Sequence, residues 1–224
     1  MTPEQKSFFA EHGYLLLNGS VSKAQVKPIA KYIADELDRL QVRSSGLKEL
    51  PPFQQIGKLS TMIKRDDLGE RLINAELRML INTLGGPRLS TGPGQLLISL
   101  PEQGTWTTRG LNWHVDISSP DPSRPAGIQA FILLDDVEPQ GGGTLVLAGS
   151  HKRSGSKEIG QRIRYILREN GDLNALLRDF GLSVVEMSGK AGDVYLMDMR
   201  LLHTPAINAR KKLRMMATIR FYPS

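Results

Sequence analysis

The feature that most constrains the fold is the stretch from Gly86 to the C-terminal end, which divides into short strand-like runs. The runs are rich in β-branched and other apolar residues, and Gly, Pro, Ser or Asp separates each run from the next. Many short strands with such separators are typical of a β-sandwich or jelly roll. The predicted strands are RLST, GQLLISLP, LNWHVDIS, GIQAFILLDDV, GTLVLAGSH, LSVVEMS, GDVYLMDM and LRMMATIRFY.

A helical segment interrupts these runs at residues 158–181. A single insertion, in place of a helix after every strand, argues against βαβ units and a parallel sheet. The longer stretch 152–182 begins with the basic, Ser- and Gly-containing KRSGSK, and apolar residues at helical spacing follow. We consider two interpretations of residues 152–182, namely a lid over a site and a helix pair packed on the surface of the β core.

The N-terminal part of the chain is predicted to be mainly helical. Thr2, Pro3 and Gln5 fit an N-cap, a first-turn proline and a reciprocal cap. Residues 14–19, YLLLNG, form a brief predicted strand, and apolar residues at helical spacing predict a helix over residues 21–41.

The Pro-Pro pair within residues 47–57 predicts a loop, and residues 66–86 predict one helix with an acidic start and glycines at its end. We find no linker between the helical and the β-rich parts. We therefore expect one domain, residues 1–224, in which a helical buttress (1–85) supports a jelly-roll core (86–224).

Composition excludes several kinds of chemistry. The chain of 224 residues has no cysteine, so disulfides, thiolate nucleophiles and Cys-ligated zinc are excluded. No apolar run approaches the roughly 18 residues of a membrane helix, and the N-terminus lacks the pattern of a secretory signal, so we expect a cytoplasmic protein without a membrane partner. The net charge of +6 favours anionic partners. No stretch interleaves aromatic and basic residues, so nucleic acid is not expected.

The run LNWHVDIS carries the most informative polar residues. Apolar and polar residues alternate along it, so His114 and Asp116 point to the same side of an extended segment. His203 follows a later apolar strand and could supply a third ligand from a neighbouring strand. Two imidazoles and one carboxylate on one face of an iron leave the other positions open. The competing interpretation is that this polar face is merely the solvated side of a surface strand.

With these residues in view, nearly the whole chain resembles the phytanoyl-CoA dioxygenase-like family of non-haem Fe(II)/2-oxoglutarate oxygenases. WHVD matches the His-x-Asp motif of that family, and IQAFILLDDVEPQGGGTLVLAGSH is similar to its strand, acidic turn and GSH ending. GKAGDVYLMDMRLLHTPAINARKKLR matches the glycine-aspartate strand, the distal histidine and the later arginine. His-x-Asp by itself is a weak motif, whereas the three motifs in this order are specific.

The resemblance implies a double-stranded β-helix, a cupin-like jelly-roll barrel, in which His114, Asp116 and His203 bind Fe(II). It places Arg214 on the distal carboxylate of 2-oxoglutarate, and the planar fork of arginine suits that role. Further residues expected near the co-substrate are Phe131, Thr144, Gln129 and Ser99. Many relatives have a tryptophan where Phe131 stands, and some place a lysine near Ser99, so the second co-substrate contact differs here.

The implied activity is a dioxygenase reaction that consumes Fe(II)-bound 2-oxoglutarate and O2, releases succinate and CO2, and hydroxylates or otherwise oxidises a C–H bond. Related halogenases lack the carboxylate ligand, so Asp116 favours oxygenation. We expect the substrate to be a small molecule of secondary metabolism. If residues 152–182 form a lid whose Arg162 and Arg164 face the substrate, we also expect the substrate to carry an anionic group. Two alternatives stay open: a non-catalytic jelly-roll binding protein, and an oxygenase of a macromolecule or a carrier-bound acyl group. Oligomeric state and substrate identity are not predicted.

Overall fold

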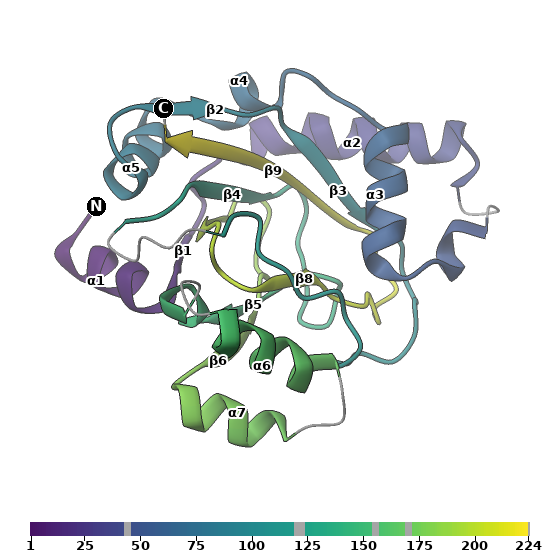
Figure 1. Ribbon diagram of the computed structural model, residues 1–224. Helices are drawn as coiled ribbons and strands as arrows, with labels where there is room; N and C mark the ends of the chain where they lie inside the picture. Colours follow the sequence, from purple (N-terminus) through teal and green to yellow (C-terminus); the bar gives the residue numbers. More distant parts are fainter. Residues whose placement is uncertain (43–45, 119–123, 154–156, 169–171, 224) are drawn as a thin grey trace.

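The computed structural model describes residues 1–42, 46–118, 124–153, 157–168 and 172–223. Figure 1 shows two sheets, with helices on the outer side of each. The helices are α1 (Pro3–His12), α2 (Lys23–Arg39), α3 (Pro52–Met62), α4 (Leu68–Leu72), α5 (Ala75–Gly85), α6 (Lys157–Arg168) and α7 (Leu173–Phe180). The strands are β1 (Tyr14–Leu17), β2 (Leu89–Thr91), β3 (Gln95–Ser99), β4 (Ile128–Leu133), β5 (Thr144–Ala148), β6 (Ser183–Glu186), β7 (Val194–Asp198), β8 (His203–Pro205) and β9 (Arg214–Pro223).

The larger sheet has six strands in the order β1-β7-β4-β9-β2, with β3 also paired to β9, and the smaller sheet has the order β6-β5-β8. Every strand pairing in the described part of the chain is antiparallel. This is the β-rich jelly-roll architecture with flanking helices that the sequence predicts. Between the described strands no ladder joins the two sheets, so the jelly roll is not closed into a continuous barrel.

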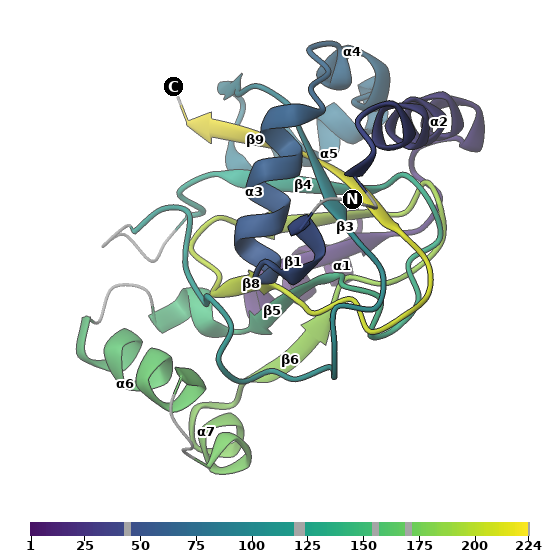
Figure 2. The same cartoon turned by 90° about the vertical axis from the view of Figure 1, so that its right-hand side faces the viewer.

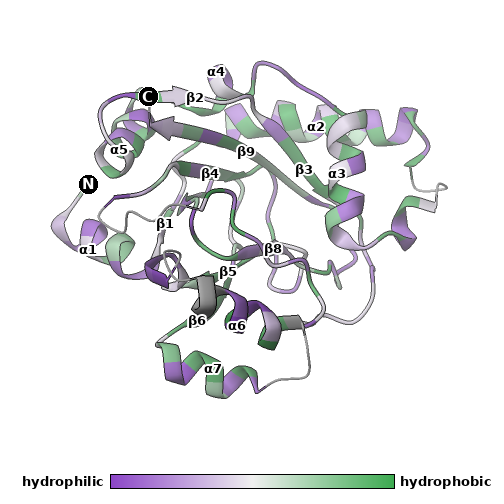
Figure 3. Ribbon diagram, in the orientation of Figure 1, coloured by the Kyte–Doolittle hydropathy of each residue, from purple (hydrophilic) through white to green (hydrophobic). Residues whose placement is uncertain are grey.

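The period-two pattern of β4 decides what each face of the larger sheet contacts. Ile128 and Ile132 point outward and belong to the core beneath the N-terminal helices. Phe131 and Leu133 point inward and pack between the two sheets. Colouring by hydropathy shows the apolar stripes of the helices turned toward the sheet (Figure 3). The larger sheet thus has an apolar layer on each of its two faces.

The N-terminal helices form as their caps and spacing predict. Thr2 and Gln5 make the reciprocal capping box of α1, with the backbone N–H of Gln5 donating to Thr2 Oγ1 over 3.2 Å. In α2 the apolar residues at helical spacing, Val26, Ile29, Ile33 and Leu37, are all buried.

The predicted loop at residues 47–57 is wrong in its second half, because α3 begins there. Its first residue is Pro52, and proline is tolerated at the first helical position because that N–H has no partner within the helix. The Pro-Pro pair therefore marks the start of a helix. α3 crosses over β3 beside β8 (Figure 2), which brings this helix to the site described below.

The single helix predicted over residues 66–86 is two helices, α4 and α5. Asn74 caps the second, because its side chain accepts a hydrogen bond from the N–H of Leu77 over 2.8 Å. Such a cap offers the chain an alternative to continuing the first helix. In the C-terminal part, α6 and α7 occupy the described part of the predicted helical stretch 158–181. They pack through Ile163, Leu167 and Leu176 on the outer side of the smaller sheet.

Within residues 152–182, the segments 154–156 and 169–171 lie outside the described residues, and the first of these is the SGS of KRSGSK. The lid interpretation of this stretch stays a prediction. Among the helices of the described chain, none is both long enough and apolar enough to cross a bilayer.

Candidate metal and co-substrate site

The predicted strand at residues 111–118 is instead an extended segment, which pairs with β8 of the smaller sheet at a single position. His114 and His203 exchange two backbone hydrogen bonds, 3.0 Å from the His114 N–H and 2.9 Å from the His203 N–H. The N–H of Asp116 donates to the carbonyl of Met199 over 3.1 Å. Alternation still places His114 and Asp116 on one side, because an extended backbone needs no full ladder to alternate.

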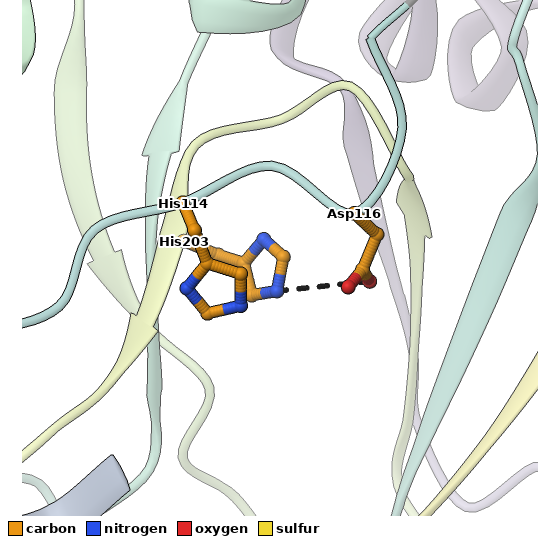
Figure 4. Close-up of side chains that lie close together, drawn as sticks. All are labelled: His114, Asp116 and His203. Atoms are coloured by element: carbon orange, nitrogen blue, oxygen red, sulfur yellow. Dashed lines mark ion pairs between the residues drawn. The ribbon is translucent and has the colours of Figure 1, made fainter.

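The three predicted ligands meet in space. Figure 4 shows the side chains of His114, Asp116 and His203 turned toward one another. One ligand atom from each lies within 4.8 Å of the others, and His203 Nε2 lies 3.8 Å from Asp116 Oδ2. The two imidazole rings are 4.3 Å apart between centroids. Such separations suit donors to one cation, since metal–nitrogen and metal–oxygen bonds are about 2.0–2.2 Å long for a metal such as zinc.

Hydrogen bonds fix which nitrogen of each histidine is available. His114 Nδ1 lies 2.8 Å from the carbonyl oxygen of Asn112, and His203 Nδ1 lies 3.0 Å from that of Leu201. A carbonyl oxygen can only accept, so each Nδ1 carries the proton and each Nε2 keeps its lone pair. Burial and, to a smaller extent, the nearby His114 lower the pKa of His203 to about 4, so this imidazole is neutral at pH 7.

The GSH turn supports the backbone next to His203. Ser150 Oγ accepts a hydrogen bond from the N–H of Leu202 over 2.9 Å, one residue before the ligand. His151 is buried, and its Nε2 lies 3.2 Å from the carbonyl of Ala10 in α1. His151 does not belong to the group of three candidate ligands. The motif therefore ties the segment that carries His203 to the N-terminal helix α1.

The three ligands open into a cavity of about 310 Å³ between the sheets. Period-two alternation selects its walls, which include Gln95 and Leu97 from β3 and Gln129 and Phe131 from β4. The remaining lining residues are Phe53, Ile56, Gly57, His114, Asp116, Thr144, His203, Pro205, Arg214, Thr218 and Arg220.

Arg214 is buried at the wall of this cavity, with 2% of its surface exposed. Its Nε donates to the carbonyl of Gly142 over 2.8 Å and its Nη1 to that of Leu97 over 2.9 Å, whereas Nη2 has no partner. Burial lowers the pKa of Arg214 to about 9, an effect that the nearby Glu186 opposes. A buried guanidinium with one unsatisfied N–H group is suited to receive an anionic oxygen.

The other predicted contacts are only partly gathered at the cavity. Phe131, Thr144 and Gln129 line it, and the Phe131 ring lies 6.5 Å from the ring of His203. Gln129 Nε2 donates to Thr218 Oγ1 over 2.9 Å, and Gln129 Oε1 is buried without a partner. Ser99 is not among the lining residues, and its hydroxyl donates to Gln103 Oε1 over 3.0 Å.

The sequence interpretation missed several lining residues, among them residues of α3 and β9. Phe53, Ile56 and Gly57 come from α3, which was predicted as a loop. Arg220 lies on β9, on the same face as Arg214 and Thr218. Counting every second residue from Arg214 would have found it.

The profile of the family described as Phytanoyl-CoA dioxygenase (PhyH) matches residues 9–216. A search of curated proteins found no match.

Solved structures with the same fold cover the entire chain. EctD from S. alaskensis, solved with 2-oxoglutarate and 5-hydroxyectoine, is 20% identical over 100% of this chain and 76% of its own, with a TM-score of 0.67. The non-haem α-ketoglutarate-dependent carbocyclase SnoK from nogalamycin biosynthesis is 19% identical over 100% and 84%, with a TM-score of 0.63. HygX from Streptomyces hygroscopicus, with nickel and 2-oxoglutarate bound, is 18% identical over 100% and 88%, with a TM-score of 0.60.

Proposed function

The chain belongs to the phytanoyl-CoA dioxygenase family, and from this premise we propose that it oxidises a C–H bond of a small molecule with Fe(II), 2-oxoglutarate and O2. The observation that carries the proposal is the shared cavity of His114, Asp116, His203 and the unsatisfied Arg214. A metal-ligand set and a buried cation without an anion are both explained by one chelating, doubly anionic co-substrate.

The donor set fits Fe(II). Two neutral imidazoles and one carboxylate, all on one side, are the ligands of non-haem iron oxygenases and leave positions for a chelating co-substrate and O2. His114 and His203 would each bind through Nε2, because the Nδ1 of each donates to a backbone carbonyl. These second hydrogen bonds hold the rings in place and make the ligand nitrogens more basic.

The residues around Arg214 fit the distal carboxylate of 2-oxoglutarate. Nε and Nη1 are held by two carbonyls, so the guanidinium is already oriented before a ligand arrives. The unsatisfied Nη2 then gains an acceptor, and the buried charge gains an opposite charge. Thr144, on β5 of the smaller sheet, also lines the cavity and would donate its hydroxyl hydrogen to the same group. When bound by these residues, iron and 2-oxoglutarate would supply the activation of O2 that the oxidation of the substrate needs, with succinate and CO2 as the co-products.

The remaining cavity walls limit side reactions. Phe53, Phe131, Leu97 and Pro205 present apolar surface to the cavity, which keeps water away from the reacting atoms. The solved structures of the same fold include a carbocyclase from nogalamycin biosynthesis and EctD with 5-hydroxyectoine. These neighbours support a small-molecule substrate in secondary metabolism over a macromolecule or a carrier-bound acyl group.

A screen for substrate-dependent succinate formation tests the function. Purified protein with Fe(II), 2-oxoglutarate and O2 is incubated with candidate small molecules, and succinate is quantified for each. We expect at least one compound to raise succinate formation and to gain oxygen or lose hydrogen in the same incubation. His203→Ala should abolish this response, whereas His12→Ala, which removes a histidine from α1, should retain it. An identical response in His203→Ala would contradict the assignment.

A further inference from the structure

Arg220 is a second guanidinium in the cavity, and the proposed function leaves it without a role. It lies further along β9 than Arg214, on the same face of the strand. Its side chain is 29% exposed, in contrast to the buried Arg214, so it is accessible to a ligand that enters from solvent.

The contacts of Arg220 leave much of its hydrogen-bonding capacity unused. Nε lies 3.4 Å from Asp116 Oδ2, and Nη2 lies 3.5 Å from Asp116 Oδ1. Both distances exceed the roughly 2.7–2.9 Å of a good charge-assisted hydrogen bond. Within the described residues its Nη1 makes no hydrogen bond. If Asp116 gives electron density to a metal ion, its hold on Arg220 becomes weaker still.

The charge balance of the cavity points to a missing anion. The cavity is lined by one carboxylate, Asp116, and two guanidinium groups, Arg214 and Arg220, while an imidazole that binds a metal ion is neutral. The charges of Fe(II), Asp116, Arg214 and doubly anionic 2-oxoglutarate sum to zero. The positive charge that remains is therefore that of Arg220. A buried or half-buried charge without a partner is costly, so an anionic ligand on Arg220 would be favoured.

Apolar surface lies in the same cavity. Phe53 is 47% exposed, and its ring lies 5.4 Å from that of His114 in an edge-on arrangement. Ile56 lies one turn further along the same side of α3. A ligand with one anionic end and an apolar body would satisfy both surfaces, and a cavity that also holds 2-oxoglutarate favours a small planar anion over a bulky one.

We propose that Arg220 binds a carboxylate of the substrate that is oxidised, and that the apolar part of this substrate contacts Phe53 and Ile56. The inference rests on the proposed function, because it assigns 2-oxoglutarate to Arg214 and the substrate to Arg220. It makes Arg220 a specificity-determining residue for small carboxylic acids.

Calorimetric titration of the Zn(II)-loaded protein separates the two assignments. The first titration adds 2-oxoglutarate, and its failure to bind would reject the proposed function. The second titration, at saturating 2-oxoglutarate, compares phenylacetate with its neutral counterpart phenylacetamide. We expect the acid to bind at least about tenfold more tightly, and Arg220→Gln to remove this preference while the affinity for 2-oxoglutarate is unchanged.

Matched variants identify the cause. Arg220→Lys keeps the charge and should retain part of the preference for the acid. Arg88→Gln removes one exposed positive charge outside the cavity and should behave as wild type. The proposal is overturned if wild type binds acid and amide equally, if Arg220→Gln keeps the preference, or if phenylacetate displaces 2-oxoglutarate. Loss of Zn(II) binding in Arg220→Gln would also overturn it, because Arg220 would then serve only Asp116.

Discussion

At the scale of single residues, the site depends on side chains that each keep one nitrogen without a hydrogen-bond partner. His114 and His203 each use one nitrogen for a backbone carbonyl and keep the other for a ligand. Arg214 leaves Nη2 unsatisfied in a buried position. Unsatisfied buried groups are uncommon in folded proteins because each costs free energy. Among the described residues, Arg214 Nη2 and Gln129 Oε1 are two such atoms that lie at one cavity, and this is the residue-level argument for a ligand site.

Arg214→Ala should weaken 2-oxoglutarate binding far more than metal binding. Removing one partner of a buried, hydrogen-bonded charge pair costs about 2–5 kcal/mol, which corresponds to a loss of about thirtyfold or more in affinity. The dissociation constants of 2-oxoglutarate and of the metal, measured separately by calorimetry, check this. Arg210→Ala is the control, because Arg210 donates to the carbonyl of Pro139 and does not line the cavity. If Arg210→Ala lost as much affinity for 2-oxoglutarate as Arg214→Ala, the assignment of the co-substrate to Arg214 would be contradicted.

The titration of His203 should be visible in the stability of the metal-free protein. Burial lowers its pKa from the ordinary value of 6.5 to about 4. Between these two pH values the unfolded chain therefore binds more protons than the folded chain. The neutral, buried His203 thus contributes to the free energy of unfolding fully above pH 6.5, and this contribution is lost as the pH falls toward 4. Urea unfolding across this range should show that slope in wild type and a smaller slope in His203→Gln. Equal slopes in the two proteins would contradict the lowered pKa.

At the scale of elements, the predictions succeeded where side-chain spacing decided the structure and failed where single backbone positions did. The core residues of α2 and the alternation of β4 could be read from the sequence. The two-proline start of α3 and the Asn74 cap of α5 depend on which backbone groups find partners, and spacing does not reveal that.

The same distinction applies to the site. His114, Asp116, His203 and Arg214 could be named because their types and order resemble a family with known chemistry. Arg220 has no motif of its own, and its place follows only from the register of β9 against β4, where it lies opposite Gln129. Likewise, the contribution of α3 was out of reach once its first residues were predicted as a loop.

Two glycine substitutions test how tightly helix α3 and the residue before strand β3 pack against their neighbours. An added Cβ at Gly57 would meet nothing within 4 Å, and its backbone is helical. Gly57→Ala should therefore raise the free energy of unfolding by about 0.5–1 kcal/mol through helix propensity alone. Gly94→Ala should lower it, because the new Cβ would lie 2.7 Å from Leu68 Cβ. Chemical denaturation measures both, and destabilisation by Gly57→Ala would mean that α3 packs more tightly than described.

At the scale of the whole molecule, the cavity is assembled from segments that are far apart in the chain. α3 brings Phe53, the extended segment brings His114, and the strands of the larger sheet bring Arg214 and Arg220. The antiparallel sheets fix the relative positions of these segments, while the outer helices bury the opposite face of the larger sheet. The fold thus separates the apolar core that stabilises the protein from the polar cavity that carries its chemistry.

Part of the positive charge of the molecule is located at the cavity. The chain has a net charge of +6, and two of its arginines, Arg214 and Arg220, line the cavity together with a single carboxylate, Asp116. Both anions that we propose, the co-substrate and the carboxylate of the substrate, would enter a cavity that attracts them. This attraction acts at the site itself and needs no lid arginines, so Arg162 and Arg164 are not required for it.

The central claim is that one chain binds one metal ion and one 2-oxoglutarate at the same site. Anaerobic equilibrium dialysis of wild type and His203→Ala with Fe(II) and labelled 2-oxoglutarate measures both stoichiometries directly. We predict one equivalent of each for wild type, tight 2-oxoglutarate binding only when metal is present, and loss of both ligands in His203→Ala. Binding of 2-oxoglutarate that is equally tight without metal, or metal binding that survives in His203→Ala, would contradict the account.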